Sequence, residues 1–168
     1  RTPLMYAIGA TAQNLDVVNE LLDRGADVNE PTLMGLTPLL LATKKEHTSI
    51  VKHLLARGAS VSAQFPNDQN SSLHYACIQG NGKILDILLK HITKALSDEH
   101  LQNILYLTNK DGKTALDLAK TLASENPDST ARAEIYEQLR NLYLAKEKEI
   151  EDVVETLLKK EAAEQQHQ

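Results

Sequence analysis

The chain has 168 residues, of which 42% are apolar and 24% charged, and its formal net charge is -5. This composition is typical of a globular protein and excludes the disordered and fibrous classes. The acidic balance argues against nucleic acid or an anionic membrane as the main partner, because phosphate binding needs clustered cations.

The residue types narrow the fold further. There is no Trp, one Phe and five Tyr, against 27 Leu and 18 Ala, a mixture that suits many thin helix-helix contacts. A single cysteine, Cys77, excludes an internal disulfide framework and predicts a reducing, cytoplasmic compartment. No apolar run approaches the roughly 18 residues of a membrane span, so we expect no membrane association.

Two phrases recur in phase along the chain. The first is a hexad: TPLMYA at 2–7, TPLLLA at 37–42, SSLHYA at 71–76 and TALDLA at 114–119. The second follows the first two hexads, as LLDRGADVN at 21–29 and LLARGASVS at 54–62. Self-similarity at this spacing indicates a repeat architecture.

These phrases resemble the ankyrin repeat, a unit of about 33 residues with a β-turn and two antiparallel helices. The resemblance implies an all-α fold, an ankyrin-repeat solenoid of helix-turn-helix units with β-turn tips, ending in a long C-terminal helix. We expect the solenoid over 1–145, with repeats at about 1–31, 32–65, 66–108 and 109–145. One unit cannot bury its apolar face alone, so the units must stack.

Repeats 1 and 2 have recognisable helix boundaries. Thr37 and Pro38 predict a helix start, since Thr supplies a capping oxygen and Pro suits the first turn. Gly58 predicts a left-handed helix end, and Val61 is expected to fill the following loop. Repeat 1 starts without its own β-turn, yet four of its residues have the character of an interior: Leu4, Met5, Tyr6 and Ile8. We therefore expect further repeats or another domain upstream.

Repeat 3 departs from the pattern by an insertion near 92–108. Its second helix begins near Ile84 and meets no Gly that would stop it before Leu96. Ser97 then predicts the cap of a short helix that carries Leu101, Ile104 and Leu105. The insertion is either a lid on the binding face or a packing elaboration.

Repeat 4 ends in a helix that is too long for one repeat. Asn126 and Pro127 predict an N-cap and first helical residue, and no Gly or Pro follows them. A helix over 128–164 would be about 55 Å long. Residues 146–168 form an amphipathic extension with a second apolar stripe: Ile150, Val153, Val154, Leu157 and Leu158.

We expect the side chains of that stripe to be buried against another surface. One interpretation is a kink near 146–149, after which the helix folds back to cap the last repeat. The other is an interface with a partner or with a second copy, although three heptads at most are available for a coiled coil. Residues 161–168 are expected to be frayed and solvated.

The sequence shows no recognisable catalytic or metal-binding pattern. In the family, His74 occupies a position that hydrogen-bonds the turn, and His47 lies where a structural Gly-His pair is common. The lone Cys77, expected to be buried, makes a zinc site improbable. Asp111-Gly112-Lys113-Thr114 is interpreted as a β-turn running into a helix cap. We expect no catalysis, no metal and no cofactor.

The resemblance implies that turn tips and first helices line a concave groove that binds a partner protein or peptide. The matching positions are Leu33, Met34, Leu36, Lys44, Lys45, Asn67, Asp68, Asn70, Ile78, Gln79, Lys110, Asp111 and Lys113. Phe65 is added because it lies beside the turn of repeat 3, outside the regular pattern.

Within this set, Leu33, Met34 and Leu36 are apolar where turn tips are usually polar, and clustered exposed apolar groups mark interfaces. Lys44 and Lys45 would border them and favour a partner with acidic groups. In the alternative interpretation, the insertion or an upstream segment covers these side chains.

Two functions are compatible with these features. The first is a non-catalytic scaffold for protein-protein interaction. The second is a regulatory or targeting arm of a larger enzyme or of a secreted bacterial effector, whose catalytic part lies outside this chain. The glutamate-rich C-terminus resembles the tails of some effectors, which would place the protein in the host-cell cytosol.

Overall fold

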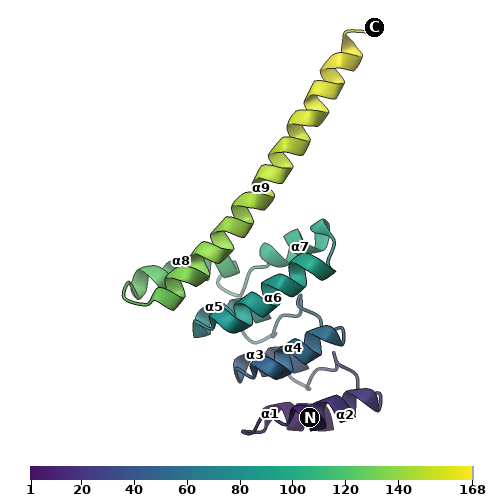
Figure 1. Cartoon of the computed structure of the whole chain (residues 1–168), viewed down its shortest axis with the longest axis vertical. Coiled ribbons are helices and arrows are strands. Elements are labelled where there is room, and N and C mark those ends of the chain that lie inside the picture. The colour runs from purple at the N-terminus through teal and green to yellow at the C-terminus, as the bar shows by residue number, and fades with distance from the viewer. Residues whose placement is uncertain (168) are drawn as a thin grey trace.

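The computed structural model describes residues 1–167, which form nine α-helices and no β-strand (Figure 1). They are α1 (Pro3–Gly9), α2 (Leu15–Asp23), α3 (Pro38–Lys44), α4 (Thr48–Ala56), α5 (Ser72–Gln79), α6 (Gly82–Ala95), α7 (Asp98–Leu105), α8 (Ala115–Glu125) and α9 (Thr130–Gln165).

The helices form pairs that stack in chain order. The first helices α1, α3, α5 and α8 contact one another in succession, and so do the second helices α2, α4, α6 and α9. Figure 1 shows these layers, from α1 and α2 at one end to α8 and α9 at the other. Buried apolar side chains from every layer join into one cluster that runs from Leu4 to Tyr143. The predicted all-helical solenoid is confirmed.

Threonine caps open three of the four first helices. The Oγ1 atoms of Thr2, Thr37 and Thr114 accept hydrogen bonds from backbone N–H groups three residues on, at 3.2, 3.3 and 3.2 Å. A side-chain acceptor here satisfies an amide that the helix leaves unpaired. Pro3 and Pro38 occupy the first turn, as expected.

Repeat 3 has Ser71 at the cap position, and the side chain of His74 completes a capping box with it. His74 Nδ1 lies 3.2 Å from the Ser71 amide nitrogen and 2.8 Å from Ser71 Oγ. Its Nε2 lies 2.9 Å from the carbonyl oxygen of Lys113. Because a carbonyl only accepts, Nε2 carries the proton and Nδ1 is the acceptor. The predicted turn-bonding role is confirmed, and the bond joins repeats 3 and 4. His47 joins repeats 2 and 1 similarly, with Nε2 3.2 Å from the Ala10 carbonyl oxygen.

The second helices end as the glycines predict. Gly58 has φ +88°, the left-handed region in which a Cβ is disfavoured. Val61 in the following loop is buried. The interior character of repeat 1 holds for Leu4, Met5 and Ile8, which are all buried, but Tyr6 is 64% exposed.

The insertion is a packing element. As predicted, α6 runs on to Ala95, Ser97 caps α7, and the three apolar residues of α7 are buried. The Tyr143 hydroxyl of α9 donates to the Leu105 carbonyl. The ring of Tyr106 meets that of Tyr143 edge-on, with centroids 5.3 Å apart. The insertion therefore supports α9 from the side.

The start of the last helix differs from the prediction. α9 begins at Thr130, and the Ser129 hydroxyl accepts from the Arg132 amide at 3.4 Å. Asn126 instead closes α8, since both its amide N–H and its Nδ2 donate to the Leu122 carbonyl. The residue before a proline disfavours helical geometry, so Asn126 ends one helix and does not start the next.

Of the two interpretations of the last helix, the kink with fold-back is wrong. α9 continues without interruption through 146–149, because nothing there breaks a helix, and projects away from the stack (Figure 1). At that level Lys146 Nζ lies 3.0 Å from Asp98 Oδ1 and 2.8 Å from Glu149 Oε2. The expected frayed tail is helical to Gln165 and exposed. Gln168 lies outside the described residues.

A guanidinium ties α9 to the rest of the stack. Arg132 Nη1 and Nη2 donate to the carbonyl oxygens of Cys77 and Ile78 at 3.1 and 3.0 Å. Both carbonyls are in the last turn of α5, where helical acceptors lack partners within the helix, and the Cys77 carbonyl also accepts from the Gly80 amide at 3.2 Å. A cation at this end is also favoured by the helix dipole.

Replacing Arg132 is therefore expected to destabilise the fold. Arg132→Ala removes two charge-assisted hydrogen bonds, each worth about 1.5–3 kcal/mol when fully buried. Because the side chain is half-buried, we expect a total loss of about 1.5–3 kcal/mol in urea unfolding followed by circular dichroism. The control Arg140→Ala changes an exposed residue of the same helix and should cost less than about 0.5 kcal/mol. Equal losses for both variants would contradict this role.

A second prediction concerns pH and His74. Burial lowers the pKa of His74, and this effect outweighs the carbonyl of Lys113 and the charge of Asp68, which raise it. The unfolded chain thus binds a proton first, near its ordinary pKa of 6.5. The contribution of His74 to stability is complete above that pH and declines as the pH falls below it.

The test compares His74→Gln with the wild type by urea unfolding from pH 8 to pH 5. At pH 8 the variant should be less stable by about 1–3 kcal/mol, since it disturbs buried hydrogen bonds. That difference should shrink below pH 6.5. A difference that is constant across this range would contradict the assigned protonation state.

Candidate functional site

Three hairpin loops project between the stacked helix pairs. They span residues 32–36, 65–70 and 109–113, and each is closed by an amide of its first residue donating to the carbonyl of its last, at 2.8, 3.0 and 2.9 Å. The loop of repeat 3 is one residue longer than the other two. Phe65 begins this longer loop, which accounts for its place outside the regular sequence pattern. The predicted turn tips therefore exist and carry the candidate residues.

The tip of repeat 2 presents apolar side chains to solvent. Leu33 is fully exposed and Met34 is 72% exposed. Thr32 holds the loop, since its Oγ1 accepts from the Leu36 amide at 3.2 Å. Gly35 has φ +82°, and a Cβ there would lie 2.6 Å from Pro66 Cγ. Only glycine fits this close approach, which seats the loop of repeat 2 against that of repeat 3.

Beside this tip lies an apolar hollow of about 270 Å³. It is lined by Arg1, Thr32, Leu33, Met34, Leu36 and Phe65. The structure thus brings Phe65 together with the three apolar residues of the repeat 2 turn. The expectation that the insertion covers them is not met, since α7 packs beside α9 at the other end of the stack (Figure 1).

Lys44 is held next to the hollow by two aromatic rings. Its Nζ lies 5.0 Å from the Phe65 ring centroid and 5.1 Å from that of Tyr75, within the range of cation–π attraction. The Tyr75 hydroxyl donates to the carboxylate of Asp68, with oxygens at 2.9 and 2.8 Å. These four side chains, from α3, the repeat 3 loop and α5, form a cation-aromatic-carboxylate cluster.

Asp68 is ionised within this cluster. Burial alone would raise the pKa of its carboxyl, but hydrogen bonds from Asn70 and Tyr75, together with the charge of Lys44, lower it below the ordinary value. Asp68 therefore balances part of the positive charge of Lys44.

The other groove candidates divide by exposure. Six of them are exposed: Lys45, Asn67, Ile78, Lys110, Asp111 and Lys113. Gln79 is half-buried, and its Nε2 donates to the Lys44 carbonyl at 3.0 Å.

The expectation that Asn70 contacts a partner is wrong. It is buried, and its Oδ1 accepts from Asn109 Nδ2 at 3.0 Å. It joins two loops and is not available to a partner.

Sequence reasoning missed two tyrosines on the first helices. Tyr75 holds Lys44 and Asp68, and Tyr6 is exposed on α1. Both occupy the fifth position of the hexad, where Leu41 and Leu118 stand in the other repeats. An aromatic residue at an otherwise aliphatic position was the signal available in the sequence.

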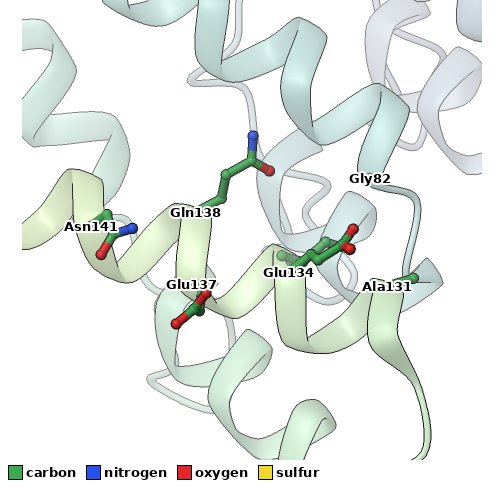
Figure 2. A pocket seen from close by; sticks show the side chains of 7 residues that line it. Gly82, Ala131, Glu134, Glu137, Gln138 and Asn141 are labelled. Atoms are coloured by element: carbon green, nitrogen blue, oxygen red, sulfur yellow. The ribbon is translucent and has the colours of Figure 1, made fainter.

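A larger hollow of about 450 Å³ lies between α6 and α9. Figure 2 shows Glu134, Glu137, Gln138 and Asn141 projecting from α9, with Gly82 at the start of α6. These side chains are exposed. In residues 1–167 the buried side-chain atoms without a hydrogen-bond partner are Ser72 Oγ and Gln79 Oε1, and both lie elsewhere. We therefore favour the smaller, apolar hollow as the site.

Residues 1–167 also bear on metal binding and on membrane association. No group of three or more His, Cys, Asp and Glu side chains is placed to hold a metal ion. No helix there has the length and apolarity needed to cross a membrane. Cys77 is buried as expected, and burial raises the pKa of its thiol to about 12 despite the nearby Arg132.

The five residues of the second stripe, Ile150, Val153, Val154, Leu157 and Leu158, are exposed on α9, between 43% and 59%. They lie beyond Lys146, whose ammonium contacts Asp98 of α7.

Similar proteins share this segment within much longer chains. A putative palmitoyltransferase, ZDHHC13 of Danio rerio, is 35% identical over 116 residues, covering 67% of this chain and 16% of that protein. Inversin of Canis lupus familiaris is 36% identical over 103 residues, covering 61% and 9%. The nuclear factor NF-kappa-B p105 subunit of Gallus gallus is 30% identical over 115 residues, covering 65% and 11%.

The family described as ankyrin repeats (3 copies) matches residues 4–98, more than half of the chain. The match covers the helix pairs α1–α2, α3–α4 and α5–α6. The pair α8–α9 continues the same stack beyond the matched residues. The chain therefore belongs to the ankyrin-repeat family.

Proposed function

We propose that this segment is a protein-interaction scaffold that binds a partner protein or peptide through the loop tips and first helices of repeats 2 and 3. Ankyrin repeats generally act as protein-protein interaction modules. The observation that carries the proposal is the fully exposed Leu33 beside the apolar hollow. Burying an aliphatic side chain of this size is worth about 1.5–3 kcal/mol, which is forgone while it stands in water.

The hollow and the cluster define what would bind. An apolar side chain of the partner fills the hollow against Leu36 and Phe65. Lys44 is held between two aromatic rings, with its ammonium at the border of the hollow. Binding a partner there therefore costs less side-chain entropy. Asp68 balances part of the charge of Lys44. A preference for acidic groups in the partner therefore depends also on Lys45, which is exposed. Apolar contact supplies affinity and the lysines orient the partner.

The relatives favour a second candidate function. This chain matches 16%, 9% and 11% of three longer proteins, one of which has the name of a putative palmitoyltransferase. The same surface would then serve as a regulatory or targeting arm of a larger protein, an enzyme or a secreted effector. The sequence of the whole protein separates the two, since a catalytic domain outside this segment would decide for the arm.

The docking surface is tested by replacing its apolar tip. We expect Leu33→Asp with Met34→Asp to reduce the amount of captured partner about tenfold or more, because two charged groups replace the side chains that enter the interface. The measurement is quantitative mass spectrometry of proteins that the immobilised chain captures from a cell lysate. Both residues are exposed, so helical content by circular dichroism should not change.

The matched control is Val17→Asp. Val17 is 47% exposed on α2, a second helix away from the loop tips, and the change adds the same kind of charge. Capture by this control should equal that of the wild type. If the tip variant captures the same proteins in the same amounts as the wild type, the site assignment is wrong.

A further inference from the structure

The outer half of α9 is a separate surface. Past Lys146 the helix projects from the stack (Figure 1), and each residue from 147 to 167 is exposed. Its one apolar face is the second stripe, which spans eight residues from Ile150 to Leu158, or about 12 Å of helix. No described part of the chain packs against this stripe.

The stripe continues the face by which the inner half of α9 packs. Ile135, Leu139 and Tyr143 are buried against the solenoid. Ile150 follows Tyr143 by seven residues, and Leu157 follows by seven more, so each lies within about 20° of the one before around the helix axis. One continuous face is therefore buried at its inner end and free at its outer end. A heptad-spaced face of this kind is suited to another helix.

The charged residues around the stripe indicate what kind of helix would bind to it. Residues 147–167 contain seven acidic and three basic side chains, a net charge of -4 with His167 neutral. Glu147 and Glu151 lie along the edge of the stripe marked by Leu158, and Glu161 follows Leu157 by one turn. Lys148 and Lys159 lie on the opposite side of the helix, and Lys159 is paired there with Glu155, its Nζ 2.8 Å from Oε1. Lys160 follows Val153 by seven residues and lies along the other edge of the stripe.

A second copy of this chain fits poorly. It would bring another segment of the same negative charge, and like charges across an interface are destabilising. A helix with aliphatic residues at heptad spacing and Lys or Arg at its flanks satisfies both the apolar stripe and the acidic edge.

We propose that residues 147–161 of α9 form a docking site for a basic amphipathic helix of a partner protein. The short stripe supplies register, and the carboxylates supply a salt-dependent attraction. This site is independent of the hollow beside Leu33, because it lies on the last helix, beyond the end of the stack.

The test uses two fluorescent peptides of three heptads and the full chain. Both peptides carry Leu at positions a and d; one carries Lys at e and g, and the other Glu. We expect the Lys peptide to bind, by fluorescence anisotropy, at least about tenfold more tightly than the Glu peptide. Its affinity should fall further when the salt concentration is raised from 50 to 500 mM.

Variants then locate the binding. Val154→Glu with Leu157→Glu should abolish binding of the Lys peptide. The control, Thr156→Glu with Ala163→Glu, adds the same charge on the opposite side of the exposed helix and should retain it. Glu147→Gln with Glu151→Gln should weaken binding about three- to tenfold while leaving the stripe intact.

Four outcomes would overturn the proposal. These are no binding of either peptide, equal binding of both, equal loss in the stripe variant and its control, or a dimeric mass in light scattering that the stripe variant converts to a monomer. The last result would assign the stripe to a second copy.

Discussion

Each helix pair in this chain buries its apolar residues only against the pairs before and after it. The constraint is visible at the sixth position of the hexad, where Ala42, Ala76 and Ala119 are all almost completely buried. A small side chain there allows successive first helices to approach closely, and larger residues such as Leu39 and Leu73 fill the space between layers. The core is therefore a continuous column, which explains why large aromatic rings are rare in it.

Stacking at this spacing determines where the loops lie. The loops of repeats 3 and 4 are joined by the Asn70–Asn109 side-chain hydrogen bond, and the Lys110 amide donates to the Asp68 carbonyl at 3.0 Å. The loops of repeats 2 and 3 are joined by contact of Gly35 with Pro66. These links bury Asn70 and Asn109, whereas Asn67, Lys110 and Asp111 remain exposed on the same loops. The tip of repeat 2 carries the exposed apolar residues Leu33 and Met34, which line the apolar hollow.

The last helix, α9, packs against the stack along its inner half and is exposed to solvent along its outer half. Its inner half is a repeat helix, tied down by Arg132 and by contacts of Tyr143 with α7. Its outer half has the same periodicity but no neighbour. Lys146 marks the boundary, where its ammonium meets Asp98 and Glu149. The insertion in repeat 3 is thus a support for the point at which α9 leaves the stack.

The amino-acid sequence by itself determined the repeat, its helix caps and its left-handed turns, because these depend on contacts within a few residues. Thr37, Gly58 and Ser97 are examples. It also identified Leu33, Met34 and Phe65 as unusual for their positions. Tertiary structure alone decided that these three share one hollow, since Phe65 begins the next loop along the chain. It likewise decided that Asn70 is buried and that Tyr75 holds Lys44, because both depend on neighbouring layers. The sequence left the course of α9 past Lys146 ambiguous. An apolar stripe indicates that another surface covers it, but it does not indicate where that surface lies.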